Sequence, residues 1–187
     1  VAVMVGTGKA AEMGILIKSA ESLEMLHKVD TVVFDKTGTL TSGKPAVKDV
    51  IVICSRLNKD EFIHIASSLE AKSEHPIAHA ILSIGQSNNT PLSETERFEA
   101  VPGRGIKAQM NGSEYLAGNI ALLKENGINA TNEVKSITDK IAKEGKTPLV
   151  FAENNEIIGI ISVADTVRDC GKEAITELHK MGIKTVL

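Results

Sequence analysis

Apolar and polar positions follow two different periods along this chain, which predict a mixed α/β protein. Runs of β-branched and aromatic residues over 31–34 and 183–187 are typical of buried strands, and a shorter apolar run predicts a strand over 15–17. Alternating or compact apolar segments predict further strands over 47–53, 98–101, 106–110, 113–116, 147–152 and 156–163. Apolar positions spaced three or four residues apart predict helices over 19–28, 59–69, 77–85, 120–126, 132–144 and 170–181.

The order of these elements indicates one domain interrupted by another. Segments 1–44 and 165–187 hold strands and helices of the kind found in an α/β domain, whereas segment 45–164 combines alternating strands with helices. The pattern changes near Pro45 and again near Asp165. We therefore expect an α/β domain with an inserted α+β domain whose strands form an antiparallel sheet flanked by helices.

The strand over 31–34 ends at Asp35, and Gly38 turns the chain directly afterwards. A carboxylate at the carboxyl end of a parallel strand lies where open α/β sheets bind their ligands. With Lys36, nearby hydroxyl groups and free backbone amides, this carboxylate suits nucleophilic attack on a phosphoryl group whose oxygens the cation and amides would hold. A single aspartate at this place would more often only cap a turn.

Composition narrows the classes of partner. At 187 residues, 42% hydrophobic and with a net charge of −3, the chain is an ordinary globular sequence. The acidic balance and an aromatic content of 3% argue against a nucleic-acid partner. Cys54 and Cys170 stand apart from each other and from ligand-spaced histidines, which favours reduced structural thiols. No segment approaches the roughly 20 apolar residues of a membrane span. We see no signal peptide, and Val1 at the first position suggests a piece of a longer chain.

The inserted segment contains the elements of an adenine site. A glutamate and a histidine lie five residues apart, a Gly-x-Gly turn follows, and a Gly-Asn pair ends a strand. An imidazole face, backbone that can approach closely and a few polar side chains suit a flat adenine ring. The residues are Glu70, His75, Gly103, Gly105, Gly118 and Asn119. Taken singly, the two glycines of the Gly-x-Gly turn need only form a turn, and the asparagine only a helix N-cap.

Two groups of motifs resemble a known family. DKTGTLT, from Asp35 to Thr41, resembles the phosphorylation motif of the P-type ATPases, cation pumps whose phosphorylation domain belongs to the haloacid dehalogenase superfamily. SEHP, from Ser73 to Pro76, resembles the nucleotide-binding domain of the heavy-metal, type IB subclass, as do the Gly-x-Gly turn and the Gly-Asn pair. The resemblance covers nearly the entire chain. It implies a partial haloacid-dehalogenase-like (Rossmann-type) phosphorylation domain over 1–44 and 165–187, and a nucleotide-binding domain over 45–164.

The resemblance also implies a role for each matching residue. Asp35 corresponds to the phosphorylated aspartate, with Lys36 beside it, and the six residues of the insert correspond to the ATP site. Mg²⁺ would lie between Asp35, the backbone carbonyl of Thr37 and the phosphate. Thr37 stands where related phosphatases have an acid, and a hydroxyl there removes a general acid/base, so the aspartyl phosphate should hydrolyse slowly.

The function implied is that of a copper(I)-exporting ATPase, because Met4 to Gly8 and Gly14 to Lys18 resemble the copper pumps more than the zinc/cadmium pumps. We expect the chain to be a cytoplasmic-facing part of an integral membrane protein, with the membrane and actuator domains of the same pump and Cu⁺ as partners. The family's Thr-Gly-Asp loop, its Gly-Asp-Gly segment and its Cys-Pro-Cys motif are absent. The fragment should therefore bind nucleotide without phosphorylating itself efficiently or transporting metal. The alternatives are a zinc/cadmium pump, a free-standing phosphatase and a nucleotide-binding module without chemistry.

Overall fold

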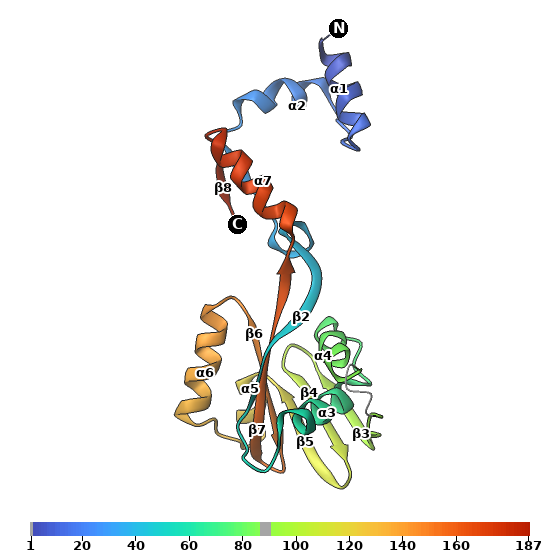
Figure 1. Cartoon of the computed structure of the whole chain (residues 1–187), viewed down its shortest axis with the longest axis vertical. Helices are drawn as coiled ribbons and strands as arrows, with labels where there is room; N and C mark the ends of the chain where they lie inside the picture. The colour runs from blue at the N-terminus through green and yellow to red at the C-terminus, as the bar shows by residue number, and fades with distance from the viewer. Residues whose placement is uncertain (1, 87–90) are drawn as a thin grey trace. The chain divides into compact units, whose positions relative to one another are not determined.

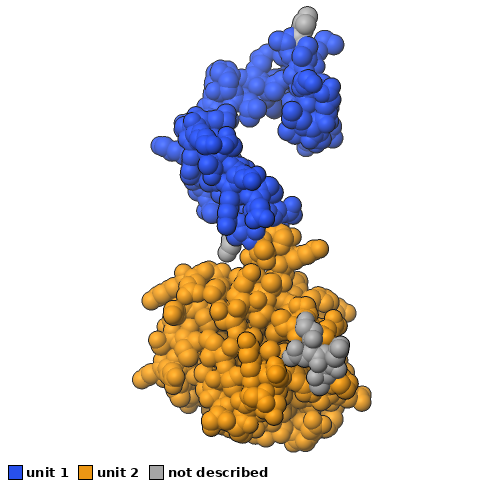
Figure 2. Space-filling model, viewed as in Figure 1, with its two compact units in different colours: residues 1–40, 167–187 blue, residues 41–166 orange. Residues whose placement is uncertain are grey.

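The computed structural model describes residues 2–86 and 91–187, apart from the side chains at positions 36 and 37. The chain divides into two units, one formed by residues 1–40 and 167–187 (unit 1) and one formed by residues 41–166 (unit 2) (Figure 2). The domain boundaries expected from the sequence, at 44/45 and 164/165, fall inside two strands, β2 (Thr41–Val52) and β7 (Glu156–Val167). Each unit is described by itself below.

Unit 1 contains a two-stranded parallel ladder between β1 (Thr31–Val33) and β8 (Lys184–Val186), in which Val32 lies opposite Thr185. Its other elements are α1 (Ala2–Glu12), α2 (Ala20–Met25), η1 (Leu26–Lys28), η2 (Lys36–Leu40) and α7 (Asp169–Lys180). The Ser19 side chain caps α2 by accepting a hydrogen bond from the Ser22 amide at 3.1 Å.

Two sequence-based expectations for unit 1 are wrong. The apolar run over 15–17 has no regular structure, and Leu16 is 86% exposed, so this run lacks a strand partner. The strand over 31–34 is present but is not buried, since Val33 is 74% exposed. Within the described residues β1 pairs only with β8, and a strand is buried on both faces only when a wider, covered sheet surrounds it.

Unit 2 is built on a six-stranded sheet with the order β2-β7-β6-β5-β4-β3 (Figure 1). The ladders from β3 to β7 are antiparallel. The strands not yet given are β3 (Arg97–Val101), β4 (Gly105–Met110), β5 (Ser113–Gly118) and β6 (Thr147–Glu153). The helices are α3 (Lys59–Glu70), α4 (Pro76–Gln86), α5 (Ile120–Glu125) and α6 (Asn132–Lys143). Two-residue turns at Asn111-Gly112 and Asn154-Asn155 have positive φ, which matches the right-handed twist of hairpin strands.

Helices cover both faces of this sheet. Successive residues of a strand point to opposite faces, so neighbouring residues of one strand pack against different helices. Phe151 of β6 packs in one core cluster with residues of α3 and α4, and its ring meets that of Phe62 edge-on at 5.4 Å. The neighbouring Val150 packs in a second cluster with residues of α5 and α6. Figure 1 shows α3 and α4 apart from α6 across the strands.

The prediction that residues 165–168 break the sheet is wrong, because β7 continues to Val167. The Asp165 carboxylate accepts hydrogen bonds from the Thr41 hydroxyl and from the Ser42 hydroxyl at 3.3 Å. It also accepts one from the Gly43 amide at 3.2 Å. A charged residue is therefore accommodated where β7 runs beside the start of β2. No helix among the described residues is long and apolar enough to cross a membrane.

Candidate functional site

A cavity of about 320 Å³ in unit 2 collects most of the residues singled out in the insert. It is bounded by the junction of α3 and α4, by the turn between β3 and β4, and by the first residues of β6. Its lining includes five of the six sequence-predicted residues, namely Glu70, His75, Gly103, Gly105 and Asn119. The sixth, Gly118, lies opposite Gly105 in the antiparallel ladder between β4 and β5.

The Gly-x-Gly turn and the Gly-Asn pair form one structural unit. A Cβ at Gly105 would lie 2.1 Å from the carbonyl oxygen of Ala117, and a Cβ at Gly118 would lie 2.2 Å from that of Arg104, so only glycine lets the two backbones approach. Asn119 joins the parts, because its Nδ2 donates to the Gly103 carbonyl at 3.2 Å. Its Oδ1 also accepts from the Leu122 amide at 3.0 Å and caps α5. The simpler roles of turn and N-cap are therefore real, and they also shape one wall of the cavity.

Glu70 supplies a buried carboxyl group to the cavity. It is the last residue of α3 and is 5% exposed. Burial raises the pKa of Glu70 from its ordinary 4.5 to about 6, and a hydrogen bond from the Ser73 side chain partly offsets the effect. The carboxyl group is thus mostly ionised at neutral pH, in a place where ionisation is costly.

His75 precedes α4, and its ring is oriented by the first turn of that helix. The Ile77 amide donates to Nδ1 at 3.2 Å, so Nδ1 acts as an acceptor. The neutral ring must then carry its proton on Nε2. His75 can therefore offer a donor at Nε2 as well as an apolar ring face.

Apolar groups form much of the remaining wall: Ile77, Ala78, Val101, Pro102, Ile106 and Leu149. Such a wall with a few polar groups is typical of sites for flat organic ligands, whose cavities measure about 300–1,000 Å³. The sequence analysis gave no role to Ser73, Arg104 or Thr147, which also line the cavity. Arg104 could have been found, since it lies between the two glycines, whereas Thr147 reaches the cavity only through the strand order of the sheet.

Asp35 lies in unit 1, two residues after β1, at the carboxyl end of a parallel strand as expected. Its side chain is exposed. Arg168 contacts the following element, η2. Its amide donates to the Leu40 carbonyl at 2.9 Å, and its guanidinium donates to the Gly38 carbonyl at 3.3 Å. The side chains of Lys36 and Thr37, both sequence-predicted, lie outside what the structure describes.

The described residues hold no group of three or more histidine, cysteine, aspartate or glutamate side chains that could bind a metal ion. The exposed Asp35 carboxylate is an oxygen donor that suits Mg²⁺, which takes one or two protein carboxylates and completes its shell with water and phosphate oxygens. The residues present therefore fit Mg²⁺ better than a metal that needs a full protein cage.

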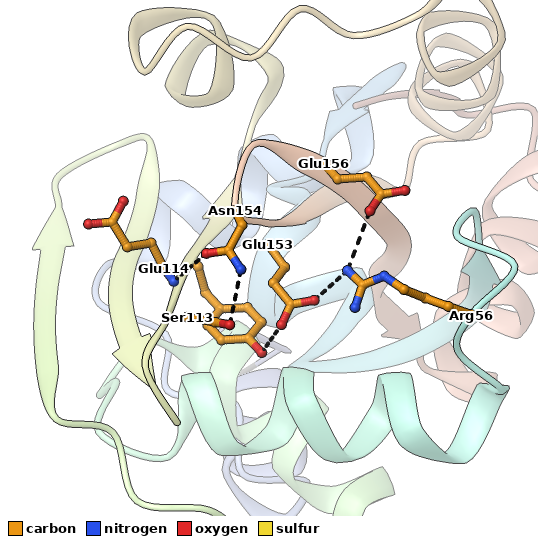
Figure 3. Close-up of polar contacts among 7 residues, drawn as sticks. Arg56, Ser113, Glu114, Glu153, Asn154 and Glu156 are labelled. Atoms are coloured by element: carbon orange, nitrogen blue, oxygen red, sulfur yellow. Dashed lines mark hydrogen bonds and ion pairs between the residues drawn. The ribbon is translucent and has the colours of Figure 1, made fainter.

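A second cluster of polar side chains lies at the opposite ends of β5 and β6 from the cavity (Figure 3). The Glu153 carboxylate accepts hydrogen bonds from the Tyr115 hydroxyl and from Arg56, and Arg56 also pairs with Glu156 at 3.5 Å. Burial raises the pKa of Tyr115, and the carboxylate beside it acts in the same direction. These groups satisfy one another, which is what a structural role for the cluster requires.

Comparisons with known proteins show which families this chain is similar to. A family model described as haloacid dehalogenase-like hydrolase matches residues 29–187. Copper-exporting P-type ATPases of Staphylococcus saprophyticus and Staphylococcus aureus strain JH9 are 44% and 40% identical to the chain over 185 residues, or 99% of it. The chain spans 22% of the length of these curated relatives.

Among solved structures, a zinc-transporting PIB-type ATPase in the E2.Pi state superimposes with a TM-score of 0.82 at 33% identity. The match covers 99% of this chain and 30% of that one.

Proposed function

The chain belongs to the haloacid dehalogenase-like hydrolase family, and we propose that it forms the ATP-binding and phosphorylation region of a copper(I)-exporting P-type ATPase. Unit 2 binds ATP, and Asp35 of unit 1 accepts its terminal phosphoryl group. The observation that carries this proposal is the cavity, because five residues chosen for their chemistry from scattered parts of the sequence line a single space.

The base of the nucleotide enters the cavity against the apolar wall. The ionised Glu70 accepts hydrogen bonds from an exocyclic amino group, and His75 Nε2 donates to a ring or ribose acceptor. The turn at Gly103, which the Asn119 side chain holds by a hydrogen bond, lets the backbone approach the ligand closely. A donor and an acceptor presented together favour adenine over a base whose corresponding edge has the opposite pattern.

Asp35 attacks the phosphoryl group as a carboxylate nucleophile, and its exposure leaves it accessible to a phosphate donor. Bound Mg²⁺ supplies charge neutralisation for the transferring oxygens. Thr37, in place of an acid, slows the attack of water on the aspartyl phosphate. A pump needs an acyl phosphate that survives long enough to be coupled to transport.

Copper(I) is the proposed cargo, because the copper-exporting relatives are 44% and 40% identical whereas the zinc-transporting structure is 33% identical. A zinc pump is the second candidate, supported by that structural similarity. In cells that produce the whole protein, Asp35→Asn should lower tolerance of copper salts and leave tolerance of zinc salts unchanged. The opposite result would replace copper with zinc.

Calorimetric titration of the chain with ATP tests the nucleotide site. We expect binding with and without Mg²⁺, and we expect His75→Ala to weaken it by about tenfold, or about 1.4 kcal/mol. His79→Ala is the matched control, because His79 is an exposed histidine in the adjoining helix α4 and is not among the residues that line the cavity. Absence of binding by the folded chain, or equal effects of the two substitutions, would refute the proposal.

A further inference from the structure

Arg104 occupies the middle of the Gly-x-Gly turn, and both sides of its backbone are fixed. Its amide donates to the Val101 carbonyl at 3.0 Å, and its carbonyl accepts from the Asn119 amide at 2.9 Å. Because these bonds use only the main chain, they hold the residue at the wall of the cavity whatever its side chain does. The side chain is therefore available for a task other than shaping the turn.

Charge distinguishes this residue from the rest of the wall. Among the described residues that line the cavity, Arg104 is the one lysine or arginine, and Glu70 is the one carboxylate. A nucleotide with several phosphates adds negative charge to a wall that already contains the Glu70 carboxylate, and a cation near the phosphates offsets that repulsion. A guanidinium group suits this task because its fork of N–H donors matches phosphate oxygens.

In the structure the Arg104 guanidinium forms an ion pair with Glu125, the last residue of α5, and its Nη1 donates to Oε1 at 2.6 Å. The pair is open to solvent, since the side chains are 39% and 56% exposed. Exposed ion pairs of this kind contribute little to stability. A phosphate group can therefore replace Glu125 as the partner of the guanidinium at a small cost in free energy.

We propose that Arg104 binds the phosphate chain of the nucleotide in this cavity, and that Glu125 holds the guanidinium at the rim until the phosphates arrive. The assignment rests on the proposed function. It divides the cavity into a base end, at Glu70 and His75, and a phosphate end, at Arg104. Arg104 thereby sets the preference for nucleotides over nucleosides, whereas the base end acts on both.

Parallel calorimetric titrations with ATP and with adenosine test the division. Arg104→Ala should lower the affinity for ATP about tenfold, or about 1.4 kcal/mol, and change the affinity for adenosine by less than about twofold. Glu125→Gln should raise the affinity for ATP at low ionic strength, and the gain should fade as salt screens the charges. Lys124→Ala is the control. It removes a positive charge from an exposed residue next to Glu125 that does not line the cavity, and it should change the affinity for neither ATP nor adenosine.

Arg104→Gln, which keeps a polar side chain but removes the positive charge, is measured beside Arg104→Ala, and circular dichroism verifies that both variants fold. An unchanged ratio of ATP to adenosine affinity in both Arg104 variants overturns the inference. If binding still falls in His75→Ala, the proposed function survives that result. Binding that depends on Arg104 but not on His75 leaves the phosphate end in place and refutes the base end. A wild-type chain that binds neither ligand refutes both.

Discussion

Glu70 should cost the protein stability, and replacing it should reveal the cost. The folded chain raises the pKa of this carboxyl group from 4.5 to about 6 because the group is buried. Each pKa unit corresponds to about 1.4 kcal/mol, so keeping Glu70 ionised in the fold costs about 2 kcal/mol at pH 7. Glu70→Gln removes the charge and keeps an acceptor and a donor for Ser73. We therefore expect the variant to be more stable than the wild type by about 2 kcal/mol at pH 7.

The sign of the pH dependence follows from the raised pKa. Below the unfolded value of 4.5 the carboxyl group is neutral in both states, so the wild type bears no cost there. The cost appears as the pH rises from 4.5 to about 6, where the unfolded chain gives up this proton more readily than the folded chain. Above about 6 the folded group is ionised too, and the cost stays constant. The difference in unfolding free energy between Glu70→Gln and wild type should thus be near zero at pH 4 and reach its full value above pH 7.

Urea unfolding followed by circular dichroism between about pH 4 and pH 8 measures this difference. Glu74→Gln is the control, since Glu74 is an exposed carboxylate four residues away. A Glu70→Gln variant that is less stable than wild type at pH 7, or a difference that does not change with pH, would refute the reasoning. In the proposed function the same variant should bind ATP more weakly, because an ionised acceptor is lost.

Three further substitutions test the packing around the sheet. Tyr115→Phe should destabilise the chain by about 1–3 kcal/mol, because it removes a donor from a buried carboxylate, and thermal unfolding measures the loss. Burial raises the pKa of Glu153, but hydrogen bonds from Tyr115 and Arg56 keep it below its usual value, so their contribution should be lost as the pH falls through the folded-state pKa, below 4.5. Gly105→Ala should cost more than about 2 kcal/mol, since its Cβ meets a carbonyl at 2.1 Å. Gly103→Ala, with φ of 69° but open space, should cost about 1 kcal/mol, and equal losses would contradict the difference in packing.

Most elements of unit 2 could be predicted from the sequence because their signals are local. Apolar spacing indicated α3 to α6, and the Asn111-Gly112 turn fixed the register of the hairpin that joins β4 and β5, with Met110 opposite Ser113. The strands β2 and β7 were predicted too short. Their extra residues are a mixture of polar and apolar types without strict alternation. The two extensions also contact each other, because Asp165 accepts hydrogen bonds from the start of β2.

The candidate site was predictable to a different degree in each unit. In unit 2 the motifs indicated residues of the cavity wall, but the strand order that brings Thr147 of β6 to the same cavity has no signal in the sequence. In unit 1 the β-branched and aromatic run over 31–34 predicted a strand that ends before Asp35. The hydrogen bond from Arg168 to Gly38 of η2, however, spans 130 positions of sequence. Long-range contacts of this kind follow from the fold and not from local pattern.

The residues of the cavity differ in how much of their presence the fold itself explains. Gly105, Gly118 and Asn119 are required by packing and capping, so a stable fold would need them even without a ligand. Glu70 is the reverse case, because a neutral side chain at the same place would suit the fold better at neutral pH. A residue that opposes stability and faces a cavity has its explanation in what the cavity binds. Of the six residues predicted for the nucleotide site, Glu70 therefore gives the strongest physical argument that the cavity serves a ligand.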